Sequence, residues 1–399
     1  MSNSSTRRAT TANVSAFDEW IRTRFIELNT QLEELYFAQP NPAAVADTGA
    51  AIKEHLVSEG LNFIAQLLRE GNTDEGFDSG FDLLGNVGFY MGACRRHEIT
   101  EPSRETTSPL IEASALALQL GASLGVTPRF ATSHLATHNR AIDGVYKSFT
   151  SLKAEYVFLD YNTRAVFAYK RAADALVRIL PMGISHPVAY DLLLAAEDAL
   201  HDVARSNDEL YQKLDTDRFF YCVRPYYKPH RVGLHEYRGA NAGDFAGINE
   251  IDLLLGLCQA DDPSYSQLLV DKILYMMPED QARLRDCMRQ QSLLDSLLGQ
   301  MDASGSSLWF RKNAGVFLRV CDAHGAAAGQ HHDKLVKKFI DQPAEHLPEQ
   351  NKKGLTASGP PLPILLKTLE KLRDLRLAAD RDDIPNRYKD LKKLRAAVG

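Results

Sequence analysis

His332, in a chain of 399 residues, is a candidate functional residue because its reactive imidazole has apolar neighbours at helical spacing. Leu335, Val336 and Phe339 follow it three, four and seven residues later, spacings that place all four side chains on one face of a helix. An imidazole on a buried apolar face must either form hydrogen bonds or bind a metal ion. From these residues alone, a hydrogen-bonded core histidine and a metal ligand both stay open.

The segment upstream of His332 consists of small residues, GAAAG at positions 325–329. Side chains this small let something large lie flat against a helix, and either a neighbouring helix or a flat prosthetic group would fit. The adjoining His331 points to another side of the helix, and we predict that it is peripheral.

Arg224 is the second candidate, because it stands in a run of aromatic residues, FFYCVRPYY. A guanidinium among rings is suited to bind a carboxylate through two hydrogen bonds while a ring packs beside it. A structural salt bridge is the alternative. The run 224–241, RPYYKPHRVGLHEYRGAN, lacks apolar periodicity and predicts a loop, which is where binding residues often lie.

Nearly all other segments have the apolar period of a helix, and strand-like alternation is lacking. The pattern predicts an all-α, multi-helix bundle. Helices are predicted over residues 16–37, 115–125, 154–180, 186–214, 248–258, 308–340 and 363–376. We expect a disordered polar tail and an N-terminal helical layer within residues 1–107, and a single larger domain over residues 108–399.

Composition and charge limit the classes of partner and location that fit this chain. A net charge of −6 argues against a nucleic-acid partner. No apolar run reaches the roughly 20 residues that span a bilayer, so no membrane partner is expected. The start of the chain lacks the apolar core of a secretory signal, and the five cysteines form no CxxC pair. These features predict a cytoplasmic location. Zinc-site, P-loop and GxSxG motifs are absent from the sequence.

Several segments, taken in order, resemble the indoleamine and tryptophan 2,3-dioxygenase superfamily of haem proteins. FFYCVRPYY is similar to its Phe-Phe-x-x-x-Arg segment, and GLHEYRGANAGDFAGINEIDLLLGL to the loop and helix that follow. Further along, the family's Tyr-Met-Pro stop is resembled by ILYMMP, and its axial-histidine segment by HDKLVKKFI. Its Gly-Thr-Gly-Gly loop is resembled by GLTASG, and its last helix by PILLKTLEKLR. The similarity covers residues 155–378. The RPYYKP loop and the chain length look closest to the haem enzymes of pyrrolnitrin biosynthesis, which rearrange a chlorinated tryptophan.

The resemblance implies an indoleamine dioxygenase-like bundle that encloses a b-type haem, heme b. It makes His332 the axial iron ligand and Arg224 the clamp for an amino-acid carboxylate. Its remaining implications are walls for an indole ring at Phe219 and Phe220, a substrate or propionate contact at Thr356, and a cofactor contact at Asn241. The partners that the resemblance implies are a small-molecule indole or amino-acid substrate, dioxygen, and further copies of the chain in a homo-oligomer (dimer or tetramer).

The chain departs from the family pattern at three points. The glutamine after Ala-Gly is Asp244, and the propionate-pairing arginine before the axial histidine is Gly329. Arg311, Lys312 or Arg319 is then expected to supply the missing base. The distal position, a histidine or serine in the family, aligns with Ala165, or alternatively with Thr163. His134 and His138, on an earlier segment, are further alternatives for the distal residue.

Four hypotheses follow. The first is a haem-dependent 2,3-dioxygenase that binds an indole or tryptophan-like substrate and activates dioxygen on a His332-ligated haem. The second is a haem enzyme of secondary metabolism that rearranges or oxygenates a tryptophan or tyrosine derivative. The third is a haem-binding protein without turnover, and the fourth is a helical protein without a cofactor.

Overall fold

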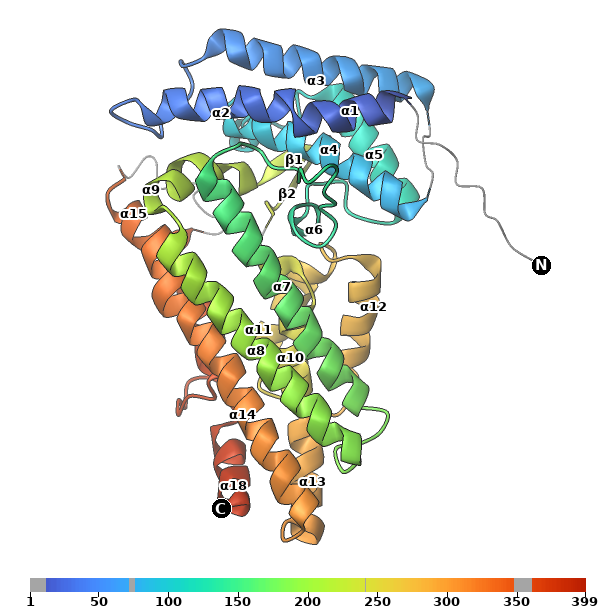
Figure 1. Cartoon of the computed structure of the whole chain (residues 1–399), viewed down its shortest axis with the longest axis vertical. Coiled ribbons are helices and arrows are strands. Elements are labelled where there is room, and N and C mark those ends of the chain that lie inside the picture. Colours follow the sequence, from blue (N-terminus) through green and yellow to red (C-terminus); the bar gives the residue numbers. More distant parts are fainter. Residues whose placement is uncertain (1–11, 72–75, 241, 348–360) are drawn as a thin grey trace, which may run out of the picture. The chain divides into compact units, whose positions relative to one another are not determined.

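The computed structural model describes residues 12–71, 76–240, 242–347 and 361–399. Helices form most of the described chain, and its strands are one short antiparallel hairpin of β1 (His230–Val232) and β2 (His235–Tyr237), so the all-α prediction is confirmed (Figure 1). The chain divides into two compact units. The first comprises Met1–Leu159, Leu214–Asn241 and His346–Pro361, and the second comprises Asp160–Lys213, Ala242–Glu345 and Leu362–Gly399. These interleaved ranges differ from the boundary expected near residue 107, which stays a prediction.

The first unit is built mainly from N-terminal helices that pack around a group of aromatic rings. Phe25, Phe89, Phe130 and Phe149 are at most 1% exposed and contact one another in a chain of tilted and edge-on pairs. The helix predicted over residues 16–37 is two helices that meet at Thr23. The helices of this unit are α1 (Ala12–Arg22), α2 (Arg24–Phe37), α3 (Ala50–Glu70), α4 (Phe77–Arg96), α5 (Ile111–Leu124), α6 (Thr132–Leu135) and α9 (Thr216–Arg218), with a short 3₁₀ turn at Pro102–Arg104.

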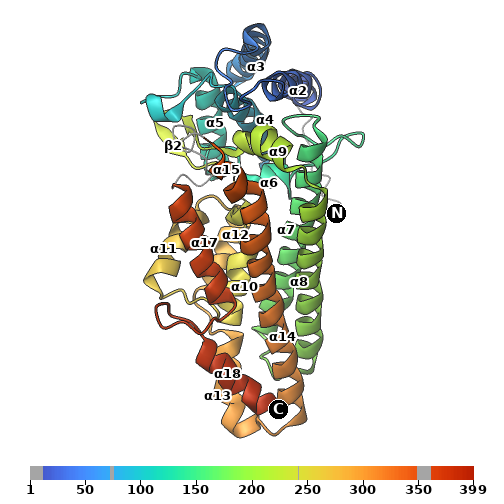
Figure 2. The same cartoon turned by 90° about the vertical axis from the view of Figure 1, so that its left-hand side faces the viewer.

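In the second unit α8 (Pro187–Lys213) lies along α14 (Leu308–Gln330), as both views show (Figures 1 and 2). The buried side of α8 repeats at alternating steps of four and three residues, from Ala189 through Leu193, Ala196 and Leu200 to Val203. Such steps keep the apolar side chains in one stripe along the helix. The other helices are α7 (Lys153–Ile179), which belongs to this unit from Asp160 onward, α10 (Gly247–Leu255), α11 (Pro263–Ile273), α12 (Pro278–Cys287), α13 (Leu293–Ser304), α15 (Gln342–Glu345), α17 (Leu362–Arg376) and α18 (Tyr388–Val398).

A buried polar network joins four helices of the second unit, α10, α11, α14 and α17. The fully buried Asp252 of α10 accepts two hydrogen bonds of 2.8 Å from Arg376 of α17 and one of 2.8 Å from the Tyr265 hydroxyl. His324 of α14 lies with its Nε2 2.7 Å from the same carboxylate. Arg376 and His324 together hold the pKa of Asp252 below its usual range, although burial acts in the opposite direction.

None of the helices described is both long enough and apolar enough to cross a membrane.

Two helical glycines provide a test of close packing. A Cβ on Gly88 of α4 would lie 2.9 Å from the Cα of Phe130, whereas one on Gly299 of α13 would meet nothing within 4 Å. We expect Gly88→Ala to destabilise the protein by about 1–3 kcal/mol because backbone must move. Gly299→Ala is expected to stabilise it by roughly 0.5–1 kcal/mol through helix propensity. Thermal unfolding measures both, and equal effects would contradict the packing at Gly88.

Candidate functional site

Arg224 begins a tight turn that follows a single π-helical turn. The π-helical segment η2 (Phe219–Val223) ends where the backbone N–H of Arg224 donates to the carbonyl of Phe219, and the 3₁₀ turn η3 (Arg224–Tyr227) continues the chain. π-Helical turns are rare and occur often at functional sites. The loop predicted for residues 224–241 is therefore an ordered turn followed by the β hairpin.

The guanidinium of Arg224 has no carboxylate partner among the described residues. It is partly buried, and its Cζ lies 5.6 Å from the ring centre of Phe220. Desolvation, with no neighbouring charge to oppose it, lowers the pKa of Arg224 to about 10. The salt bridge considered as the alternative role is thus not formed within the described chain, and a positive charge is left for an anion.

Aromatic side chains of the first unit surround this turn. Phe219 and Phe220 are both less than 10% exposed. The ring of Phe158 lies 4.9 Å from that of Phe219 and 5.6 Å from that of Tyr227, measured between centroids. The hydroxyl of Tyr227 is buried without a hydrogen-bond partner. Phe158 and Tyr227 were not predicted as site residues, because Phe158 lies 61 positions before Phe219.

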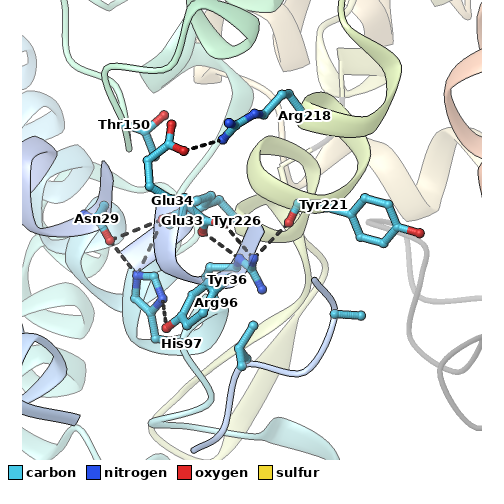
Figure 3. Close-up of polar contacts among 12 residues, drawn as sticks. Asn29, Glu33, Glu34, Tyr36, Arg96, His97, Thr150, Arg218, Tyr221 and Tyr226 are labelled. Atoms are coloured by element: carbon cyan, nitrogen blue, oxygen red, sulfur yellow. Dashed lines mark hydrogen bonds and ion pairs between the residues drawn. The ribbon is translucent and has the colours of Figure 1, made fainter. Parts of the chain in front are cut away.

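A buried ion pair holds the backbone just before Arg224 (Figure 3). Glu33 of α2 is fully buried and accepts hydrogen bonds of 2.8 and 2.7 Å from Arg96 of α4. Arg96 also donates a hydrogen bond of 2.8 Å to the carbonyl of Tyr221, inside the π-helical turn. Two N-terminal helices therefore position the turn that carries Arg224.

His97 extends this network (Figure 3). The amide nitrogen of Asn29 donates to the carbonyl of Phe25, so its oxygen faces His97 Nε2 at 2.7 Å. His97 Nε2 must then carry the proton, and its Nδ1 accepts from the Tyr36 hydroxyl at 3.0 Å. Burial keeps the pKa of His97 well below its usual range, so the ring stays neutral.

Tyr226, two residues after Arg224, anchors the turn from the other side. Its hydroxyl lies 3.4 Å from the Asn29 oxygen, and its ring stacks on Phe149 with centroids 4.4 Å apart. Further along, a Cβ on Gly239 would lie 1.8 Å from the carbonyl oxygen of Tyr227, so only glycine permits this approach of two backbone segments. The turn is held before, within and after Arg224.

His332 lies in the second unit, in the long π-helical segment η5 (His331–Asp341) that continues α14. Leu335, Val336 and Phe339 are buried, which confirms the predicted apolar face, and His331 is exposed. The Nδ1 of His332 is buried without a hydrogen-bond partner, and the carboxylate of Asp333 lies 4.0 Å from its Nε2. The ring is therefore not the hydrogen-bonded core histidine that the sequence left open.

The small residues before His332 are partly explained by helix packing. Ala327 forms a buried cluster with Ala165 and Ala168 of α7 and Val203 of α8. A Cβ on Gly325 would lie 2.9 Å from the Arg376 carbonyl, whereas one on Gly329 would meet only the Asp333 carboxylate, at 3.9 Å. Ala165 thus sits among apolar side chains, and of the two glycines only Gly329 has open space beside it.

The other expected site residues are placed as follows. Arg319 is about half exposed and forms two hydrogen bonds, of 2.8 and 2.9 Å, with Glu197, so its charge is already neutralised. Asn241 and Thr356 lie outside the described residues. Both ring nitrogens of His134 are engaged, by the Ala131 N–H and the Phe81 carbonyl, each at 3.0 Å. His134 is therefore a satisfied core residue rather than a distal base.

The described chain is all-helical, and its family model places it in the haem tryptophan dioxygenase superfamily. Within it, the chain belongs to the monodechloroaminopyrrolnitrin synthase PrnB family, whose model matches residues 11–398. This is a family of haem-dependent enzymes of the oxygenase type.

The described residues fit a haem at His332. A ligand to haem iron needs a neutral imidazole with a nitrogen free of other bonds, and His332 has no hydrogen bond in the described chain. Gly329 lies about one turn before His332 and has no side chain, which leaves open space beside this stretch of the helix.

Adjacent glutamates provide a test of the buried pair. Glu33→Gln leaves the Arg96 charge uncompensated, and we expect a loss of about 3–5 kcal/mol in unfolding free energy. Glu34 is half exposed and pairs with Arg218 at 2.9 Å, so Glu34→Gln should cost less than about 1 kcal/mol. Chemical denaturation of the two variants measures the difference. Similar small losses would mean that Glu33 does not carry the network.

Proposed function

We propose that the chain is a haem-dependent enzyme that acts on a tryptophan derivative, with His332 as the axial iron ligand and Arg224 as the clamp for the substrate carboxylate. The unpaired, desolvated guanidinium of Arg224 is the observation that carries this proposal. A permanent charge without a partner costs stability, and an amino-acid carboxylate would compensate it.

Each residue has a defined task in the proposed reaction. A haem bound through His332 would supply the activation of dioxygen. Arg224 binds and orients the carboxylate, and Phe219 and Phe220 pack against the indole ring and exclude water from it. The Tyr227 hydroxyl is a further donor for the ligand, since it is buried and lacks a partner. Ala165 has no ionisable group, so it cannot act as a general base.

Two reactions remain candidates above the haem. The resemblance to the pyrrolnitrin enzymes suggests rearrangement of a chlorinated tryptophan toward an aminophenylpyrrole, and the resemblance to the wider superfamily suggests 2,3-dioxygenation of the indole ring. Mass analysis after incubation with tryptophan, or with a chlorinated tryptophan, and a reductant separates them. We expect the chlorinated substrate to give a product without two added oxygen atoms. A product heavier by both atoms of dioxygen would establish ring cleavage instead. A haem-binding protein without turnover would yield neither product. The b-type haem, the homo-oligomer and the cytoplasmic location stay predictions.

The iron ligand is tested by replacing neighbouring histidines. His332→Ala should lose the Soret band and at least about tenfold in haem affinity, because the axial bond is removed. His331→Ala changes an exposed ring and should bind haem normally. Absorption spectra and iron content report both. A folded His332→Ala variant with a normal Soret band and iron content would refute the assignment.

The carboxylate clamp is tested with Arg224→Met. Loss of a charge-assisted contact should raise the Kd for tryptophan, measured from the spectral shift that it induces, by about 10- to 100-fold. The variant should still bind haem. Tryptamine, which lacks the carboxylate, should bind wild type and variant alike. The matched control is Arg218→Met, since Arg218 already pairs with Glu34. An unchanged Kd for tryptophan in Arg224→Met would exclude the clamp.

A further inference from the structure

A buried carboxylate in the first turn of α7 holds a neighbouring segment of the first unit. Glu155 is fully buried, and one of its oxygens accepts a hydrogen bond of 2.7 Å from the Phe149 N–H. Its other oxygen accepts two, of 2.7 Å from the Thr150 N–H and 2.6 Å from the Thr150 hydroxyl. Glu155 forms no ion pair among the described residues, although buried carboxylates are usually paired with a cation. Its charge is therefore held by hydrogen bonds to residues 149 and 150.

Phe149 connects this carboxylate with the turn that carries Arg224. The ring of Phe149 stacks on that of Tyr226, with centroids 4.4 Å and planes 25° apart. A Cβ on Gly92 of α4 would lie 3.2 Å from the Phe149 ring and 3.6 Å from the Tyr226 carbonyl oxygen, so both residues are closely packed. Because Phe149, Tyr226 and Arg224 all belong to the first unit, a shift of Phe149 must displace the turn.

The three hydrogen bonds are best made by the ionised carboxylate. An ionised carboxylate has only acceptor sites, whereas a protonated one turns one oxygen into a donor. Protonation of Glu155 therefore takes a full acceptor away from at least one donor of Phe149 or Thr150. Burial raises the pKa of Glu155 to about 7, although the hydrogen bonds from Thr150 and Phe149 lower it. Both states are thus populated near neutral pH.

The charged and titratable groups that face Glu155 come from α2 and η3. Glu33 of α2 raises the pKa of Glu155 further, and Glu33 itself is paired with Arg96 at 2.7 Å. Tyr226 and Tyr227 of η3 stay protonated, because burial and the nearby carboxylates raise their pKa well above its usual range. None of these groups compensates the charge of Glu155, so its protonation state depends on the hydrogen bonds and on pH.

We propose that Glu155 is a positioning residue for the ligand of Arg224: its ionised carboxylate fixes Phe149, which through Tyr226 fixes the turn in its binding form. This inference rests on the proposed function, which gives a substrate carboxylate to Arg224. Glu155 itself does not contact the substrate. Because protonation of Glu155 releases part of the support, the affinity for substrate falls as the pH falls from 8 to 6.

The experiment compares Glu155→Gln with Glu112→Gln in the full, haem-loaded chain. A glutamine amide has nearly the size of the carboxyl group and, like the protonated form, has only one good acceptor oxygen. Glu112 is an exposed glutamate in the first turn of α5 in the same unit, so its replacement makes the same change in charge. Spectral titration with L-tryptophan from pH 6 to pH 8 measures affinity. Thermal unfolding of the apoprotein over the same range measures stability.

The pH dependence of binding is the main readout. In wild type and Glu112→Gln, the Kd for tryptophan should rise about 3- to 10-fold as the pH falls from 8 to 6, the effect of losing one buried hydrogen bond. Glu155→Gln should bind at every pH as weakly as wild type does at pH 6, because its side chain does not ionise. A loss of general stability would weaken binding without removing its pH dependence.

Stability should change with pH in the opposite direction. The pKa of Glu155 is about 7 in the folded protein and 4.5 as its ordinary value, so its contribution to stability is full below pH 4.5 and is lost as the pH rises through 7. The unfolding temperature of the wild-type apoprotein should therefore fall relative to that of Glu155→Gln between pH 6 and pH 8. This readout does not require a bound ligand.

Phe149→Leu tests the connection to the turn. It removes the ring that stacks on Tyr226 and keeps the backbone N–H that donates to Glu155. This variant should also bind tryptophan more weakly and without pH dependence. The double variant Glu155→Gln/Phe149→Leu should bind no more weakly than Phe149→Leu, because both changes act through one contact. Additive losses would contradict the path through Phe149.

Other outcomes also overturn the inference. If wild type binds tryptophan with the same Kd at pH 6 and pH 8, Glu155 does not position the turn, whether or not Glu155→Gln folds. If Glu155→Gln keeps the affinity or the pH dependence of Glu112→Gln, the positioning role is wrong and the proposed function stands. If wild type binds no tryptophan at any pH, the proposed function fails and takes the positioning role with it.

Discussion

The contact on which the binding turn depends is that of Arg96 with Glu33 and the Tyr221 carbonyl. Both charges are buried, and neither is tolerated there without the other. One guanidinium satisfies both a carboxylate on α2 and a backbone oxygen in η2, so the π-helical turn is held by a contact that also joins α2 to α4. The position of Arg224 is thus a consequence of helices more than a hundred residues earlier in the chain.

Both residues that carry the proposed function stand on π-helical backbone. Arg224 follows η2 and His332 lies in η5, and these are the π-helical segments of the described chain. A π turn holds its hydrogen bonds over five residues instead of four, which shifts the side chains after it relative to an α-helix. Such backbone and the unpaired polar groups beside it lower stability. The aromatic core of the first unit and the long α8–α14 contact of the second are what can offset that cost.

Much of the fold was predictable, because helical periodicity is a local property. The all-α class, the apolar face at His332 and the family are confirmed. Sequence periodicity did not predict the points at which the backbone changes its helical conformation within a continuous apolar stripe. The helix over residues 16–37 breaks at Thr23, and the helix over residues 308–340 becomes π-helical at His331, yet neither change interrupts the hydrophobic pattern. The GAAAG segment fitted a helix or a flat group equally well, and Ala327 does pack against neighbouring helices.

The sequence by itself determined which residue types stand in which order, and that was enough for the class of fold, for the family, and for His332 and Arg224 as candidates. Only the tertiary structure decided which charges are compensated. Arg319 looked as available as Arg224, but Glu197, 122 positions away, neutralises it, whereas no carboxylate in the described chain reaches Arg224. Pairing between charges depends on distances in space, and no spacing along the chain encodes them. The same reason kept the Glu33–Arg96 pair from being predicted from the sequence.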